Sequence, residues 1–248
     1  MVQFVAWFDG GVCMTLFAVR VFLFSIFPLL LSAGILLLDR SANTRDRRVE
    51  IPLVMLFGLG VTGSGIASFF GHYFLSDIVA ESIGWPSGSP FQLEMAFANL
   101  ALGILGLVAA GRRDGFREAT VIAVTVLGVG ASVVHFQDIL ATGNLAPGNT
   151  IQNIANLIKP ACLVPLLMAS RIAERSESSD AGTAPFELWR APLLRAVGLV
   201  TAIVSTAFAV GFAVGNVAAA SGLGVLIATA VLAFALASSH RSVSDGGG

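Results

Sequence analysis

The sequence has few charged residues for a chain of its length. Asp, Glu, Lys and Arg make up 12% of its 248 residues, and it contains a single Lys and a single Tyr. An ordinary soluble domain has about 25% charged residues. Such a composition excludes the polar surface of a soluble enzyme and the basic face of a nucleic-acid-binding protein, so we expect no nucleic-acid partner. Two cysteines are too few for a disulfide framework.

Apolar residues are in excess instead. Hydrophobic residues make up 56% of the chain, and a lipid bilayer is the solvent that tolerates so many of them with so few charges. We therefore predict an all-α integral membrane protein with the lipid bilayer as its surroundings. Seven apolar stretches have about the 17 or more residues that a transmembrane helix needs, and they cover residues 15–38, 51–75, 91–110, 119–142, 151–170, 193–214 and 222–238.

The basic residues predict the orientation of these spans. Arginines follow the first, third, fifth and seventh spans, whereas the connections 76–90, 143–150 and 215–221 and the N-terminal tail contain no Lys or Arg. Basic residues gather on the cytoplasmic side of a membrane. We expect a multi-pass protein of the plasma membrane, with the N-terminus outside and the C-terminus in the cytoplasm.

The longest polar connection divides the chain into two parts. We predict a five-span unit over residues 1–170, with its core bundle at 51–170, and a C-terminal hairpin of two spans over residues 193–238. A cytoplasmic linker over residues 171–192 joins the two parts. Residues 239–248 are expected to form a flexible tail.

The connection after the second span has helical signals of its own. Ser76 is expected to be the N-cap of a short helix over residues 77–84, which Gly84 would close. Ser89 and Gln92 then form a capping-box pattern, which predicts where the third span begins.

Polar side chains inside the spans are the main functional clue, because each is costly in lipid unless it has a partner or a watery cavity. All of them lie in the outer half of the expected membrane, which predicts a polar site open to the outside. We expect Arg20 to extend to the membrane interface instead. The candidate ligand- or ion-binding residues are His72, Glu94, Asn99, His135, Asp138, Asn149, Asn153, Asn156 and Lys159.

Several functions fit these residues. A permease-like or small-ligand-binding protein would use them as an outward-facing binding site. A metal centre would use His72, Glu94, His135 and Asp138, and a haem would take the two histidines as axial ligands. An accessory subunit of a membrane complex would use the asparagines to meet a partner subunit or a second copy. The sequence does not identify a cofactor, and these alternatives stay open.

The charged candidates lead to a more specific expectation. Glu94 and Lys159 are expected to belong to one buried network with His72, His135 and Asp138. An isolated charge at such a depth costs at least about 2.5 kcal/mol. Removing one partner of a buried pair would then cost on the order of 3 kcal/mol.

A set of short strings runs through the second to fifth expected spans: Gly71-His72-Tyr73-Phe74, Ile83-Gly84-Trp85-Pro86, Gly88-Ser89-Pro90-Phe91-Gln92, Glu94, Phe97-Ala98-Asn99-Leu100, His135 and Ala146-Pro147-Gly148-Asn149. Together they resemble an uncharacterised domain-of-unknown-function family of bacterial and archaeal membrane proteins. The resemblance covers about residues 51–170. It implies an integral membrane protein and supplies no established activity.

Overall fold

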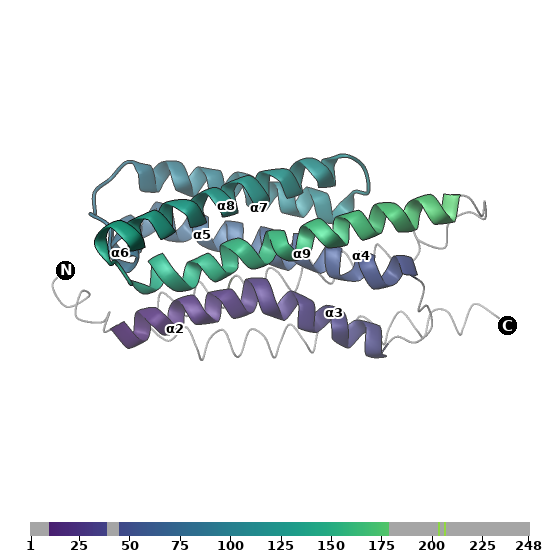
Figure 1. The fold of residues 1–248 in the computed structure, drawn as a ribbon, viewed down its shortest axis with the longest axis horizontal. Coiled ribbons are helices and arrows are strands. Elements are labelled where there is room, and N and C mark those ends of the chain that lie inside the picture. Colours follow the sequence, from purple (N-terminus) through teal and green to yellow (C-terminus); the bar gives the residue numbers. More distant parts are fainter. Residues whose placement is uncertain (1–9, 39–44, 179–202, 204–205, 207–248) are drawn as a thin grey trace.

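The computed structural model describes residues 10–38, 45–178, 203 and 206, and the regular elements within them are all helices (Figure 1). The helical fold class predicted from the sequence is thus confirmed for this part of the chain. The rest of the expected sixth and seventh spans, most of the expected linker and the expected tail lie outside the described residues.

The first long helix is built from three consecutive segments. These are α2 (Gly10–Val21), η1 (Phe22–Ile26), which has the wider turns of a π-helix, and α3 (Phe27–Leu38). Apolar side chains of η1 and α3, such as Leu23 and Phe27, are buried against α4. The first expected span therefore forms one wall of a helix bundle.

The second long helix runs through the middle of the bundle. It consists of α4 (Arg45–Met55), the π-helical segment η3 (Leu56–Gly63) and α5 (Ser64–Phe74). Within η3, the hydroxyl of Thr62 donates to the carbonyl of Phe57 five residues earlier, at 2.9 Å. All eight residues of η3 are buried, so the helix is enclosed on every side at this level.

The short helix expected after the second span is α6 (Ser76–Ile83), and Gly84 ends it at a φ of 81°. The expected cap is wrong. Ser76 is already the first helical residue, and Leu75 occupies the cap position without a side-chain hydrogen bond. An apolar side chain has no acceptor for the first helical N–H groups.

The third span is α7 (Phe91–Gly111), and it begins where the sequence predicts. The hydroxyl of Ser89 accepts a hydrogen bond from the N–H of Phe91 at 3.3 Å. Gln92 does not complete the capping box, however, because its side chain contacts His72 instead.

The last described helices are α8 (Phe116–Thr142) and α9 (Pro147–Ser178). Figure 1 shows α6 at one end of the bundle and the loop between α7 and α8 at the other. Five described helices are long and apolar enough to cross a membrane, and they agree with the first five predicted spans to within a few residues: 15–38, 46–74, 91–111, 116–142 and 147–173.

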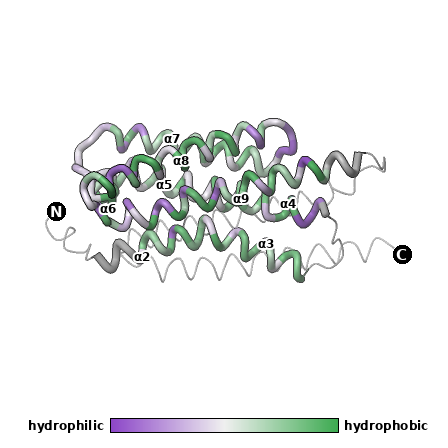
Figure 2. Tube along the Cα trace, in the orientation of Figure 1, coloured by the Kyte–Doolittle hydropathy of each residue, from purple (hydrophilic) through white to green (hydrophobic). Residues whose placement is uncertain are grey.

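The outer surface of α7 and α8 is apolar. Ile104 and Leu107 on α7 and Ile122 on α8 are 54–62% exposed. Figure 2 shows hydrophobic residues over the middle of these helices and hydrophilic residues at the start of α4 and in the loop between α7 and α8. Such a surface is unfavourable in water and suits a lipid environment.

Glycines bring the helices together in two close pairs. A Cβ atom on Gly65 of α5 would lie 2.7 Å from the carbonyl oxygen of Asn99 and from the Cα atom of Gly103 on α7. A Cβ on Gly128 of α8 would lie 2.6 Å from the carbonyl oxygen of Asn156 on α9. The bundle thus contains an α5–α7 pair and an α8–α9 pair.

A buried ion-pair network lies at the end of the bundle opposite α6. Arg117 donates to both carboxylate oxygens of Glu50, at 2.7 and 2.8 Å, and to the carbonyl of Ala109 at 3.0 Å. Both charged side chains are 0% exposed, and Arg113 lies 3.2 Å from the same carboxylate. The pairing compensates two charges that would otherwise be very costly to bury.

An exposed ion pair lies in the adjoining loop. Arg112 donates to the carboxylate of Asp114, with its Nε atom 2.9 Å from Oδ2. These hydrogen bonds, together with one from the N–H of Phe116, lower the pKa of Asp114 to about 2. The loop between α7 and α8 therefore carries a carboxylate that stays ionised well into acid.

Candidate functional site

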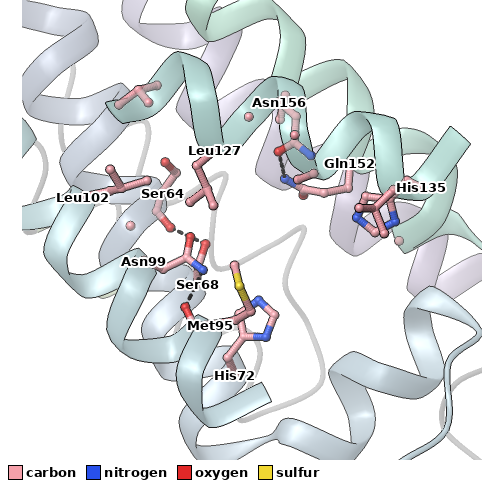
Figure 3. Close-up of a pocket in the computed structure, with 18 of the residues that line it drawn as sticks. Ser64, Ser68, His72, Met95, Asn99, Leu102, Leu127, His135, Gln152 and Asn156 are labelled. Atoms are coloured by element: carbon pink, nitrogen blue, oxygen red, sulfur yellow. Dashed lines mark hydrogen bonds between the residues drawn. The ribbon is translucent and has the colours of Figure 1, made fainter. Parts of the chain in front are cut away.

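A pocket of about 530 Å³ lies between the two helix pairs (Figure 3). Residues of α5 and α7 form one wall and residues of α8 and α9 form the other, while α2 and α6 contribute at the edges. The volume is within the range of small-molecule sites. Most of the lining is apolar, and its polar residues are Arg20, Ser64, Ser68, His72, Trp85, Gln92, Asn99, His135, Gln152, Asn156 and Lys159.

His72 lies on the α5 wall, close to α7. Its Nδ1 atom is 2.6 Å from the Oε1 atom of Gln92, which is only 2% exposed. An amide oxygen can only accept a hydrogen bond, so Nδ1 of His72 carries the proton in this arrangement. The Nε2 atom of the neutral ring is then an acceptor.

His135 on α8 has a similar arrangement. Its Nδ1 atom is 2.6 Å from the Oδ1 atom of Asn149. The amide nitrogen of Asn149 donates to Asp138 at 3.0 Å and to the carbonyl of Asn144 at 2.8 Å. These two acceptors fix which end of the Asn149 amide is the oxygen, so Nδ1 of His135 is the donor.

Asp138 accepts hydrogen bonds from the two residues that contact His135, Trp85 and Asn149. The ring of Trp85 stacks on His135 at 5.2 Å between centroids, and its Nε1 atom donates to Asp138 at 3.0 Å. Asn144 also donates to Asp138, at 2.7 Å, and to the carbonyl of Ile83 at 2.9 Å. Asp138 thereby ties the end of α6 to α8 and to the turn before α9.

Two cations lie deeper in the pocket. The Nζ atom of Lys159 on α9 donates to the hydroxyl of Ser64 at 2.8 Å. Arg20 on α2 donates to the hydroxyl of Ser68. Because the two serines are four residues apart on α5, they lie on the same face about 6 Å apart. Two cations from different helices are therefore held against neighbouring turns of α5.

The polar face of α9 is divided between the pocket and the protein interior. Gln152, Asn156 and Lys159 line the pocket, and Gln152 donates to Asn156 at 3.1 Å. Asn149 and Asn153 do not line it. The amide nitrogen of Asn153 donates to the carbonyl of Asn149 at 3.0 Å, within the helix.

The structure brings together part of the predicted site. Asp138 and Asn149 hold His135 in place, Asn153 is buried beside them, and Glu94 is exposed on α7 outside the pocket. Five of the nine predicted residues line the pocket: His72, Asn99, His135, Asn156 and Lys159.

The expected pairing of Glu94 with Lys159 is wrong. On α7, the side chains of Glu94 and Asn99 point about 140° apart, because each residue turns the helix by 100°. Only one of them can therefore face the pocket unless α7 is enclosed on all sides. Because α7 lies at the edge of the bundle, Asn99 faces inward and Glu94 outward. Lys159 is satisfied by Ser64 instead.

The expected metal ligands do not meet either. Within the described residues, no three side chains of His, Cys, Asp or Glu lie close enough to hold a metal ion. His72 and His135 line the same pocket, but Glu94 lies outside it and Asp138 is occupied by Trp85 and two amide groups. The four residues named for a metal centre therefore do not form one cluster in the described part of the chain.

Several residues of the site were not among the predicted ones. Arg20 lines the pocket rather than extending away from it, and Gln92 contacts a histidine rather than capping its own helix. Ser64 and Ser68 hold the cations. A sequence signal existed for the serines, since they precede His72 at four-residue spacing and therefore share its face of α5.

The described residues form a helical bundle that is apolar and long enough to cross a membrane and that surrounds a mostly apolar pocket with polar groups. The chain belongs to DUF6790, a family of unknown function whose model matches residues 18–176. This match confirms the resemblance to an uncharacterised family, and it includes all the described polar residues that line the pocket. No curated protein and no solved structure matches the chain.

Proposed function

We propose that this protein crosses the plasma membrane seven times and that its pocket binds a small ligand from the outside, as a permease does. The last two spans and the orientation follow from the apolar stretches and from the distribution of arginines in the sequence. The observation that carries the proposal is the pocket itself. It holds about 530 Å³ and combines apolar walls with a few polar side chains, as small-molecule sites do.

The position of the pocket supports an opening toward the outside. It extends to residues of α6 and to Trp85 at one end of the bundle. The arginines of the loop between α7 and α8, Arg112 and Arg113, lie at the opposite end. Since basic residues gather on the cytoplasmic side, the α6 end would be the external one.

Cysteine labelling tests this proposal. In a background with Cys13→Ser and Cys162→Ala, we expect Asn99→Cys to react with a membrane-impermeant thiol reagent added to intact cells. Asn99 lines the pocket, whereas Phe97 lies at nearly the same depth of α7, is 57% exposed and is not a lining residue. Phe97→Cys is the matched control and should not react, because a thiol that faces lipid does not ionise.

The results separate the parts of the proposal. Labelling of Asn99→Cys in intact cells would support a water-accessible pocket that opens outward. Labelling only in inverted vesicles would overturn the orientation. If Asn99→Cys is labelled from neither side, and is thus as unreactive as Phe97→Cys, the pocket is closed to water. This result would overturn the binding function.

A second candidate function is favoured by the histidine pair. His72 and His135 line the same pocket, and each uses Nδ1 on an amide oxygen, which leaves Nε2 as the ligating atom. Such orientation by an outer hydrogen bond is usual for metal-binding histidines, and two histidines suffice for a haem. A Soret band in the absorption spectrum of the purified protein would support this function, and the absence of both a Soret band and stoichiometric iron would reject it.

A further inference from the structure

The pocket has a distinctive distribution of charge. Arg20 and Lys159 both line it, and among the residues that the structure describes no Asp or Glu does. Within the part of the chain that the structure describes, the hydrogen-bond partners of these two cations are serine hydroxyls, which carry no charge. The pocket is thus a cationic site in an apolar surrounding.

Other arginines in the bundle, unlike Arg20, are paired with carboxylates. Arg117 pairs with the buried Glu50, and Arg171 at the same end pairs with Glu118 at 2.5 Å. Charges in a low-dielectric interior are normally compensated in this way. An uncompensated cation at membrane depth is costly, so two such cations side by side favour an anion that comes from outside the chain.

Within the described part of the chain, the hydrogen bonds of the two cations are also incomplete. The ammonium group of Lys159 has three donors and the guanidinium of Arg20 has five. The described contacts of these groups use one hydroxyl acceptor each, Ser64 and Ser68. The remaining donors can bind the oxygens of a carboxylate or phosphate, which are the groups that such donors recognise best.

We propose that the pocket binds an oxyanion, namely a carboxylate or phosphate group on a compact apolar body, and that Arg20 and Lys159 hold its charged group against α5. The apolar part of the ligand would lie along Met95 and Leu102 of α7 and Leu127 of α8, which line the same pocket (Figure 3). This inference rests on the proposed function, because it names the ligand class of that binding site.

Four probes of nearly the same shape test the inference: benzoate, phenyl phosphate, benzyl alcohol and benzylammonium. Each is titrated by calorimetry into the full-length protein in lipid nanodiscs. We expect at least one anion to bind with a Kd at least tenfold lower than that of benzyl alcohol, a difference of about 1.4 kcal/mol. The comparison of benzoate with phenyl phosphate shows which oxyanion is preferred.

Substitutions then test the two cations. Lys159→Met and Arg20→Met should each raise the Kd of the preferred anion at least tenfold and leave the binding of benzyl alcohol unchanged. Lys159→Arg and Arg20→Lys keep the charge and should retain most of the preference for the anion. These two variants keep the test decisive if a methionine variant fails to fold. Arg112→Gln removes the same charge from an exposed loop and should have no effect.

Two results would overturn the inference. Binding of benzyl alcohol or benzylammonium as tightly as the anions would refute an anion site while leaving a small-molecule pocket in place. Failure of all four probes to bind would also refute it, and the labelling of Asn99→Cys would then decide separately whether the pocket is open.

Discussion

Replacing Gly65 with alanine is expected to force α5 and α7 apart. The new Cβ atom would lie 2.7 Å from three backbone atoms, which belong to Asn99 and Gly103, whereas ordinary contacts begin at 3.4 Å. The helices would have to separate by up to about 0.7 Å, because backbone atoms cannot rotate away as a side chain can. Overpacking of this kind costs about 1–3 kcal/mol, against which the better helix propensity of alanine returns up to about 1 kcal/mol.

Relative to an alanine substitution without overpacking, which gains the same helix propensity, the loss is about 1–3 kcal/mol. Since 1 kcal/mol shifts Tm by about 2–4 °C for a chain of this size, the Tm of Gly65→Ala should lie a few degrees below that of such a variant. Thermal unfolding of the purified protein, followed by circular dichroism, measures the shift. Gly130→Ala on α8 is the matched control, because a Cβ atom there meets nothing within 4 Å. A Tm for Gly65→Ala equal to or above that of Gly130→Ala would refute the close approach of α5 and α7.

Two further predictions concern the charged end of the bundle. Glu50→Gln should lower the free energy of unfolding by about 3–5 kcal/mol, because it leaves Arg117 buried without its charged partner. Replacing both residues with apolar ones should cost less than the sum of the two single changes, and additive losses would contradict the pairing. Asp114 has a pKa of about 2 in the folded protein instead of its usual 3.8, so its ion pair stabilises the fold above about pH 4 and this contribution is lost as the pH falls through about 2. The Tm difference between wild type and Asp114→Asn should accordingly shrink as the pH is lowered over that range, and a constant difference would argue against the pair.

The long helices were predictable because lipid imposes a simple rule on a sequence. A helix that crosses about 30 Å of hydrocarbon needs about 20 apolar residues, and the first five expected spans satisfy that rule in the structure. The wide turns of η1 and η3 were not predictable in this way. A π-helical turn changes the hydrogen-bond partner by one residue without altering composition or apolar length.

The site was predictable only in part, because depth and helix face do not say which neighbour a side chain meets. Lys159 and His135 were recognised as costly groups that need a partner, and both line the pocket. Their actual partners, Ser64 and Asn149, depend on how α5 and α9 are placed in space. Glu94 illustrates the same limit, since its outward position follows from α7 lying at the edge of the bundle.

The wide turns of η3 bear on how the second long helix tolerates changes in length. A π-helical turn holds more residues than an α-helical turn, so removing one residue between Leu56 and Gly63 can be absorbed by tightening that segment to α geometry. Ser68 and His72 would then keep the face of α5 that they present to the pocket. Within α5 itself there is no extra residue to absorb a deletion, so removing one residue rotates the rest of that helix by about 100°. A single-residue deletion therefore has opposite consequences on the two sides of Ser64.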